Sequence, residues 1–348
     1  MLKPAAKWFG TMALVGAICA GSWLAAQTQE PSWPREAEDP AAPKPAPASS
    51  YWRTVIGEYE SKATATTPAK HLILFEKDGK GWVTVDRAEP RVIPRPSKDL
   101  WISVGDGPNE RVVGFVTDEG SFDRLQVGPA GGGQLRIKPL RDVAEVTKES
   151  LESSPPVETG DFKPADLVEL ATLDETIKLD IRYATTNNFL GSVFYSQARA
   201  FAQRPAAEAA LRAHKVLKSL GYGLLIHDGY RPWSVTRTFW VCTPSDKKWL
   251  VANPASGSKH NRGAAIDLTL YDLKTGAVIE MPSTYDESTS RAYAFYPGST
   301  SLQRWHRALL RRVMEAEGFT VNPEEWWHFD YKDWKSYAIG NVPFDKIR

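Results

Sequence analysis

Residues 258–267 constrain this chain more than any other stretch. They place His260 and Asp267 seven residues apart, and Gly263 between them permits a tight turn of the backbone. Imidazole and carboxylate groups are both ligands for transition metals. The stretch therefore predicts two donors of a metal site, brought together by a sharp bend.

A further donor lies near the C-terminus, where Glu324 and Glu325 precede His328. Two imidazoles and one carboxylate make a three-ligand zinc site, which keeps a fourth position open for water. Cys19 and Cys242 are too few for a thiolate zinc site or a disulfide framework. The sequence therefore predicts one catalytic Zn²⁺ held by histidine and carboxylate.

The N-terminal segment indicates export. Residues 1–26 predict a signal peptide, because Lys3 and Lys7 flank the start of an uncharged apolar run that ends in small residues. The run is short for a membrane span, so we expect a periplasmic protein without a stable span; the alternative is an N-terminal anchor facing the periplasm. Residues 27–50, rich in Pro and Ala, predict a flexible linker. A net charge of +1 gives no field that favours nucleic acid.

Residues 51–145 predict a small antiparallel β domain. Apolar runs flank turn residues at 78–79 and again at 118–120, which is typical of hairpins, and residues 135–140 are expected to add a final strand. This stretch has no cluster of histidine and acid, so we assign it no chemistry; contact with peptidoglycan is the one partner role we consider for it. Residues 146–164 predict a linker.

Residues 165–348 alternate between strand and helix patterns, which predicts an α+β domain. Pro205 opens a helix that Gly221 ends, and a second helix is expected between residues 299–301 and Gly318. Strands are expected over residues 177–183, 224–228, 264–270 and 326–331.

Four blocks of this region resemble the VanX-type D-alanyl-D-alanine dipeptidases. The blocks are residues 180–189, 228–232, 258–267 and 325–328, in the order of that family. The resemblance covers about residues 165–345 and implies a zinc peptidase with the fold of D-alanyl-D-alanine carboxypeptidases and the hedgehog signalling domain. The expected function is zinc-dependent hydrolysis of the small dipeptide D-Ala-D-Ala.

The resemblance also implies a role for each matching residue. Its metal ligands are carried over to His260, Asp267 and His328. Glu325 becomes the general base, because it lies three residues before a ligand and can reach a metal-bound water. Glu324 competes for this role, and the spacing from His328 favours Glu325. Arg231 becomes the group that offsets the negative charge of the transition state with a fixed donor fork.

Three further residues match family positions near the substrate. Asp228 is the candidate partner of the substrate ammonium group, and Ser258 or a nearby arginine is the candidate partner of its carboxylate. Tyr183 is a third candidate for the pocket. The remaining histidines of this region are expected to be structural: His214, His227 and His306.

Residues 283–301 depart from the family pattern, so the width of the pocket entrance is open. A D,D-carboxypeptidase or peptidoglycan endopeptidase on the same fold therefore remains an alternative. A zinc-bearing binding protein without turnover is a third possibility, since hedgehog relatives share the fold. The presence of Glu325 and Arg231 argues against this third reading.

Overall fold

A computed structural model gives the structure of the chain and describes residues 41–93, 101–104, 111–117, 120–125 and 136–347. The predicted signal peptide (residues 1–26) and the first part of the Pro/Ala-rich segment lie outside these ranges, so export to the periplasm stays a prediction. Within the described ranges, no helix combines the length and the hydropathy that a bilayer crossing requires.

The first part of the described chain forms a seven-stranded antiparallel sheet, called here the N-terminal sheet (residues 57–124), in the order β4-β3-β2-β1-β7-β6-β5. The predicted hairpin turn at residues 78–79 is present, with both residues in the left-handed region (φ 53° and 73°). Helix α2 (Ser50–Val55) packs on a small core shared with this sheet. The strands are β1 (Gly57–Ser61), β2 (His71–Lys77), β3 (Lys80–Val85), β4 (Arg91–Ile93), β5 (Trp101–Val104), β6 (Arg111–Thr117) and β7 (Gly120–Arg124).

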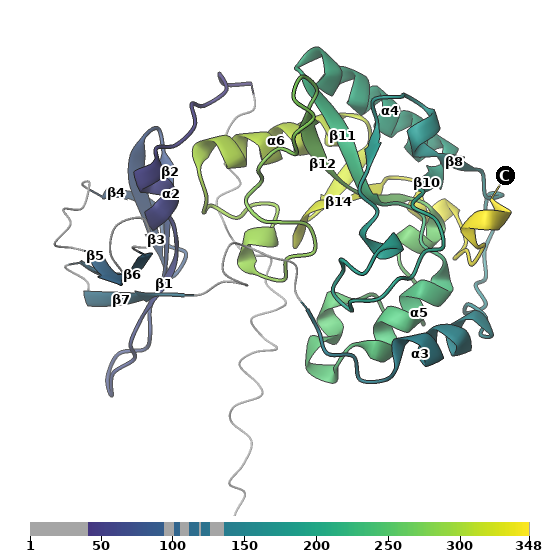
Figure 1. Ribbon diagram of the computed structural model, residues 1–348, viewed down its shortest axis with the longest axis horizontal. Helices are drawn as coiled ribbons and strands as arrows, with labels where there is room; N and C mark the ends of the chain where they lie inside the picture. The colour runs from purple at the N-terminus through teal and green to yellow at the C-terminus, as the bar shows by residue number, and fades with distance from the viewer. Residues whose placement is uncertain (1–40, 94–100, 105–110, 118–119, 126–135, 348) are drawn as a thin grey trace, which may run out of the picture. The chain divides into compact units, whose positions relative to one another are not determined.

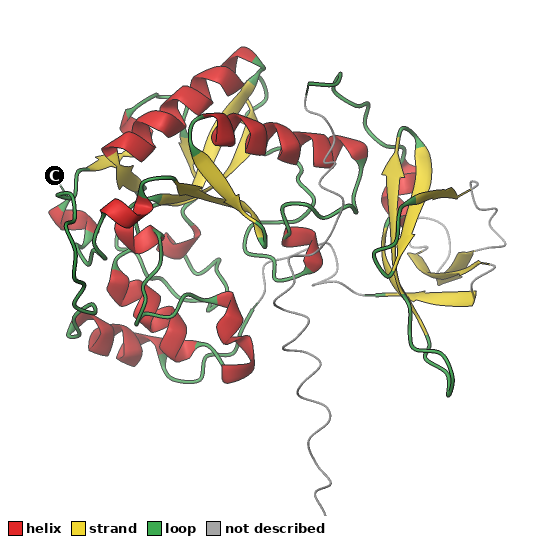
Figure 2. Cartoon of the chain, turned by 180° about the vertical axis from the view of Figure 1, so that it is seen from behind, coloured by secondary structure: helices red, strands yellow, loops and turns green. Residues whose placement is uncertain are grey.

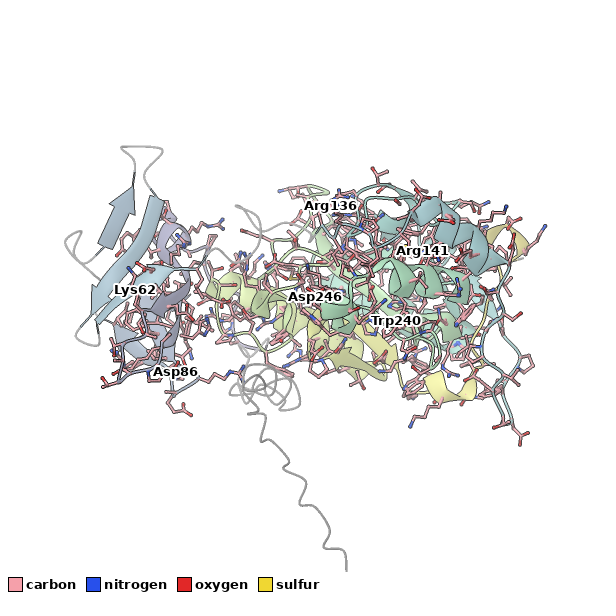
Figure 3. The ribbon with its side chains drawn as sticks, turned by 90° about the horizontal axis from the view of Figure 1, so that it is seen from below. Lys62, Asp86, Arg136, Arg141, Trp240 and Asp246 are labelled. Carbon is pink, nitrogen blue, oxygen red and sulfur yellow. The ribbon has the colours of Figure 1, made fainter. Side chains whose placement is uncertain are left out.

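Residues 136–140, expected within a last strand of the β domain, form no strand and instead join the following region. The backbone N–H of Ile137 donates to the carbonyl of Phe189 at 2.8 Å, and the Ile137 side chain is buried in the larger core. Arg136, labelled in Figure 3, donates to the carbonyl of Asn188 at 2.8 Å. These contacts with a distant segment outweigh the local strand pattern.

The segment expected as a linker after residue 145 also contains a helix, α3 (Val143–Leu151). Asp142 caps it by accepting a hydrogen bond from the Glu145 backbone N–H, and Val146 is fully buried. The helix packs against α5 (Trp233–Cys242). One buried turn of an amphipathic helix is too short a pattern to stand out among polar residues.

Residues 41–48 contact the folded core, which differs from the flexible linker that composition predicts. The ammonium group of Lys44 donates to the hydroxyl of Tyr222 at 2.7 Å. The indole of Trp305 donates to the carbonyl of Ala42 at 3.3 Å. This part of the Pro/Ala-rich segment therefore runs along the surface of the larger region.

The C-terminal region is built around a five-stranded sheet in the order β13-β14-β12-β11-β9. Four strands are antiparallel neighbours, and β9 runs parallel to β11. Helices α4 and α6 contact each other and strands of the sheet, whereas α3 and α5 pair elsewhere in the region (Figures 1 and 2). The main elements are β9 (Lys178–Leu179), α4 (Arg204–Ser219), β11 (Tyr222–Asp228), β12 (Ala265–Asp272), α6 (Ser301–Ala316), β13 (Phe319–Asn322) and β14 (Glu325–Tyr331), with a separate pair β8 (Leu167–Glu169) and β10 (Phe201–Gln203).

Most of the expected elements of this region are present. Pro205 lies in the first turn of α4, and α6 begins after Thr300, which forms a capping box with Gln303. The strand expected over residues 177–183 is only two residues long and gives way to a 3₁₀ turn at Arg182–Ala184. The mixed helix and strand content agrees with the expected class. A hedgehog-like arrangement and an independent β domain stay predictions.

Candidate metal centre

Strand pairing brings Asp267 and His328 together. Asp267 on β12 lies opposite His328 on β14 in the antiparallel register. Because side chains alternate between the two faces of a strand, their neighbours Ile266 and Phe329 point the other way, into the main core. Residues that oppose each other across an antiparallel pair share one face of the sheet. Two donors that are distant in sequence therefore lie side by side.

A short 3₁₀ turn, His260–Arg262, supplies the third donor. Gly263 closes this turn with φ 66°, and a Cβ there would lie 2.6 Å from a side-chain atom of Leu167. Only glycine fits both the backbone angle and the space. The Nδ1 atom of His260 lies 2.8 Å from the carbonyl oxygen of Gly229, so the ring donates there and turns Nε2 toward the other two donors.

The three donor atoms have the spacing of a metal site. His260 Nε2 lies 3.1 Å from His328 Nδ1 and 3.4 Å from Asp267 Oδ1, and the last two atoms are 3.0 Å apart. A tetrahedral zinc with bonds of about 2.0–2.1 Å separates its ligand atoms by about 3.3 Å. Asp267 is buried, and its Oδ1 atom faces both imidazole nitrogens. The donor set therefore fits a zinc ion.

Neighbouring groups hold the donors in place. The second oxygen of Asp267 accepts a hydrogen bond from the hydroxyl of Tyr285 at 3.0 Å. His328 Nε2 lies 3.0 Å from Asp330 Oδ1, and Asp330 in turn pairs with Lys259. A carboxylate behind a metal-binding histidine fixes the tautomer and orientation of the ring.

The electrostatic setting favours positive charge at this position. Burial lowers the pKa of His328, but hydrogen bonds to Asp267 and Asp330 outweigh burial and raise it to about 10. Burial by itself would raise the pKa of Asp267. The charge of His260, together with hydrogen bonds to His260 and His328, instead holds this pKa well below the ordinary range. An ionised carboxylate facing two imidazoles is the arrangement that a divalent cation requires.

Glu325 lies beside the candidate metal site, in a cavity of about 510 Å³. Its Oε2 atom is 3.7 Å from His328 Nδ1 and accepts a hydrogen bond from the Asn322 side chain at 3.0 Å. The side chain is 37% exposed, into the cavity it lines. Burial raises the pKa of this carboxyl group. The charge of His328 lowers this pKa and the charge of Asp267 raises it, so that the net shift is upward. Glu324 also lines the cavity but is exposed.

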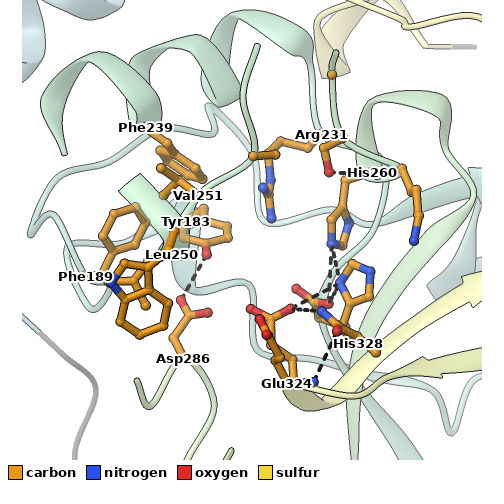
Figure 4. Close-up of a pocket in the computed structure, with 18 of the residues that line it drawn as sticks. Tyr183, Phe189, Arg231, Phe239, Leu250, Val251, His260, Asp286, Glu324 and His328 are labelled. Atoms are coloured by element: carbon orange, nitrogen blue, oxygen red, sulfur yellow. Dashed lines mark hydrogen bonds and ion pairs between the residues drawn. The ribbon is translucent and has the colours of Figure 1, made fainter. Parts of the chain in front are cut away.

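Arg231 lines the same cavity with its guanidinium group almost buried. The group donates to Asp228 Oδ2 through Nε at 3.0 Å and Nη2 at 2.7 Å. It lies 5.3 Å from the ring centre of Tyr183 and 5.1 Å from that of Phe239, and Figure 4 shows it between these rings and His260. Burial lowers the pKa of Arg231, but the charge of Asp228 more than restores it. The cavity therefore contains a fixed positive charge.

Asp228 does not line the cavity, which argues against its expected contact with a substrate ammonium group. One of its oxygens binds Arg231, and the other accepts hydrogen bonds from the Tyr195 hydroxyl and the Gly229 backbone N–H, both at 2.8 Å. The side chain is therefore saturated by protein donors. Its position fits a role in orienting Arg231.

Asp286 is a cavity residue that the sequence motifs did not single out. Its Oδ2 accepts a hydrogen bond from the Tyr183 hydroxyl at 2.9 Å (Figure 4). Burial and then the charge of Asp267 raise its pKa to about 7. Ser258, the other expected substrate residue, lines the cavity and also accepts a hydrogen bond from the His260 backbone N–H at 3.2 Å.

This fold and site agree with comparisons to known proteins. Residues 163–344 match the model of a peptidase family, Peptidase_M15, described as D-ala-D-ala dipeptidase. The match covers more than half of the chain and contains every cavity residue discussed above. The chain therefore belongs to this peptidase family.

Several curated relatives have the name D-alanyl-D-alanine dipeptidase. The protein of Escherichia coli is 32% identical over 174 residues, which cover 50% of this chain and 89% of the relative. Those of Enterococcus faecium and Enterococcus faecalis are each 35% identical, covering 46% and 45% of this chain and 90% and 87% of the relatives. Nearly the whole length of each relative is thus contained in about half of this chain.

Proposed function

We propose that this chain is a zinc-dependent dipeptidase that hydrolyses D-Ala-D-Ala. The observation that carries the proposal is the meeting of three metal donors, an acid and a fixed guanidinium group in one cavity. The donors are His260, Asp267 and His328, and the other two groups are Glu325 and Arg231. Relatives that match this region along most of their length bear the name of that activity.

The proposed chemistry divides between the metal and the side chains around it. When bound, zinc lowers the pKa of a water ligand and polarises a carbonyl oxygen. Glu325 lies close enough to His328 to accept the proton of a water at the open position and later to transfer it to the leaving amine. Its raised pKa makes this carboxyl group a better proton acceptor than an exposed glutamate.

Arg231 serves the developing oxyanion. The scissile carbonyl gains negative charge as it becomes tetrahedral, and a preorganised donor that meets this charge stabilises the transition state by about 3–4 kcal/mol. Asp228 binds two guanidinium nitrogens and so fixes the plane of the group before substrate arrives. Little reorganisation is then needed at the moment of reaction.

A dipeptidase must recognise both ends of a small substrate. Asp286 is our candidate for the ammonium group, because its carboxylate lines the cavity and Tyr183 holds it in place. Ser258 remains the candidate for the substrate carboxylate, on the side of the cavity that carries His260. A substrate without a free amine would lack the charge that this carboxylate can bind.

A substrate panel tests this proposal. Purified, zinc-loaded protein is incubated with D-Ala-D-Ala, L-Ala-L-Ala, N-acetyl-D-Ala-D-Ala and a muropeptide ending in D-Ala-D-Ala, each with and without a chelator. We expect rapid, chelator-sensitive release of D-Ala from the free dipeptide alone. Preferred cleavage of the muropeptide would instead support the carboxypeptidase or endopeptidase alternative, and chelator-resistant turnover would contradict the zinc assignment.

A further inference from the structure

Residues 283–300 form a loop that carries two side chains into the candidate site. Tyr285 donates a hydrogen bond to the metal-facing carboxylate of Asp267 at 3.0 Å. Asp286, the next residue, accepts from Tyr183 and has the left-handed backbone angle φ 58°. Aspartate is one of the few non-glycine residues that tolerate this angle. The conformation of the loop therefore decides where both side chains lie.

The middle of the loop is tied by its own side chains. Glu287 is buried and accepts a hydrogen bond from the hydroxyl of Thr289 at 2.7 Å. It also lies 3.5 Å from the guanidinium group of Arg291, which donates to the carbonyl of Pro282 at 2.8 Å. These contacts close the turn after Asp286. Within the C-terminal region, Trp326 on β14 donates to the Ser283 hydroxyl at 2.8 Å, and Arg307 on α6 donates to the Tyr296 carbonyl at 2.8 Å.

The N-terminal sheet provides one attachment through Glu58 on β1. The Glu58 carboxylate is 6% exposed and accepts a hydrogen bond from the Ser290 hydroxyl, four residues after Asp286. His71 on β2 lies 2.8 Å from the other Glu58 oxygen. Burial raises the pKa of Glu58, and hydrogen bonds from His71 and Ser290 more than offset burial, so the group is ionised at neutral pH. A charged acceptor makes this a strong contact.

A second attachment lies at the end of the loop, through Glu76 on β2. The Glu76 carboxylate is 3% exposed and accepts a hydrogen bond from the Ser301 backbone N–H at 2.9 Å, at the start of α6. The Glu76 backbone N–H donates to the Ser299 carbonyl at 3.3 Å, and Arg304 donates to the Glu76 carbonyl at 2.7 Å. The sheet thus holds the loop both near Asp286 and at its junction with the helix.

We propose that the N-terminal sheet positions the loop of residues 283–300 and thereby sets the affinity of the site for a short peptide with a free amine. This rests on the proposed function. The matched family region starts at residue 163, so it includes the loop and excludes the sheet. Glu58 and Glu76 are positioning residues: they touch the loop and its junction with α6 but do not line the cavity, to which the loop contributes Asp286, Glu287 and Ser288.

The contact between Glu58 and Ser290 can be tested from both sides. Ser290→Ala, Glu58→Gln and the double variant are compared in the full chain with Glu60→Gln, an exposed position on the same strand. The free energy lost with a hydrogen bond to a buried charge is large enough to raise KM for D-Ala-D-Ala about tenfold. We expect kcat to change less than about twofold and zinc content to stay constant, because the loop residues affected do not take part in the chemical step. The double variant should lose no more than either single variant.

Amide hydrogen exchange of residues 284–296 supplies a readout that does not depend on turnover. We expect faster exchange in Ser290→Ala and Glu58→Gln and no change in Glu60→Gln. Unchanged exchange and unchanged KM in Ser290→Ala would overturn the proposal, even if Glu58→Gln fails to fold. If the unmodified protein does not hydrolyse the dipeptide, the proposed function fails, whereas the exchange measurement still decides whether the sheet holds the loop.

Discussion

The N-terminal sheet and the five-stranded sheet are both largely antiparallel, yet only the second brings metal donors together among the described residues. The N-terminal sheet has a single histidine, His71, whose ring contacts Glu58. In the five-stranded sheet, Asp267 and His328 oppose each other across two central strands, and the turn before β12 adds His260. Strand register, rather than the number of histidines, creates the site.

The two regions also differ in how they satisfy buried charge. Glu58 and Glu76 in the N-terminal sheet accept hydrogen bonds from protein donors on both sides. At the candidate site, by contrast, Asp267 Oδ1 faces the imidazole nitrogens of His328 and His260 at 3.0 and 3.4 Å, and the Arg231 guanidinium lines the cavity. Three donor atoms gathered in this way mark a position suited to a cation. The paired carboxylates of the N-terminal sheet indicate a structural role, whereas the arrangement at the candidate site indicates metal binding and catalysis.

The largest difference in zinc content and activity should appear when a histidine is replaced in each of the two regions. His260→Ala removes one of three donors, so we expect loss of stoichiometric zinc and a fall in hydrolysis of about 10³-fold or more. His71→Ala should keep one zinc per chain. Elemental analysis of both variants checks this, and equal zinc loss in both would break the comparison between the sheets.

A smaller but still severe loss is expected at Glu325. Glu325→Gln should lower kcat by about 10²–10⁴-fold while zinc stays bound, because an amide cannot accept the proton of water. The matched control is the neighbour Glu324→Gln, whose exposed side chain should change kcat by less than about twofold. Steady-state kinetics and elemental analysis on the two proteins decide the assignment, and a larger loss at Glu324 would reverse it.

The guanidinium group of Arg231 provides a third test. Arg231→Lys keeps the charge but cannot hold both hydrogen bonds to Asp228, so kcat should fall by about 10²–10³-fold. Arg212, a surface residue paired with Glu317, serves as the control, and Arg212→Lys should leave kcat unchanged. A fall confined to KM for Arg231→Lys would mean that the residue binds the ground state rather than the transition state.

The sequence motifs pointed to His260, Asp267 and His328, which the structure brings together, because each motif is local. Residues 258–267 contain their own turn glycine, and the strands over 224–228, 264–270 and 326–331 have apolar patterns that tertiary contacts reinforce. Glu325 and His328 also lie on one short strand, β14, whose pairing with β13 is irregular at this point, and both line the cavity. The motifs themselves need no knowledge of distant parts of the chain.

The features that the sequence left open depend on contacts between distant residues. In the sequence, Asp228 is a polar residue at the end of a strand pattern. Only its hydrogen bonds with Tyr195 and Arg231 show that protein donors occupy both of its carboxylate oxygens. Asp286 lies in a loop without periodicity, so nothing local indicates that its side chain enters the cavity beside Tyr183. Residues 136–140 have a strand-like composition, but pairing with the segment around Phe189 decides their place.

The smallest predicted effect contrasts the site with a buried histidine elsewhere in the same region. Burial lowers the pKa of His306 to about 4, with a smaller contribution from the charge of Lys44, and its ring lies 3.0 Å from the Tyr222 hydroxyl. The unfolded chain, with a histidine pKa near 6.5, then binds more protons than the folded chain between pH 6.5 and 4. Stability conferred by neutral His306 is therefore present above pH 6.5 and is lost as the pH falls toward 4.

Substitution of this residue isolates the effect from other titrating groups. His306→Gln does not titrate and can still contact Tyr222, so its unfolding free energy should depend less on pH. Between pH 7 and pH 5.5 we expect the unmodified protein to lose about 1 kcal/mol more than the variant in urea denaturation. Parallel pH dependences would mean that the pKa of His306 in the folded chain is close to its value in the unfolded chain. Such a result would remove the contrast in pKa between His306, which burial keeps neutral, and His328, whose pKa hydrogen bonds to two carboxylates raise to about 10.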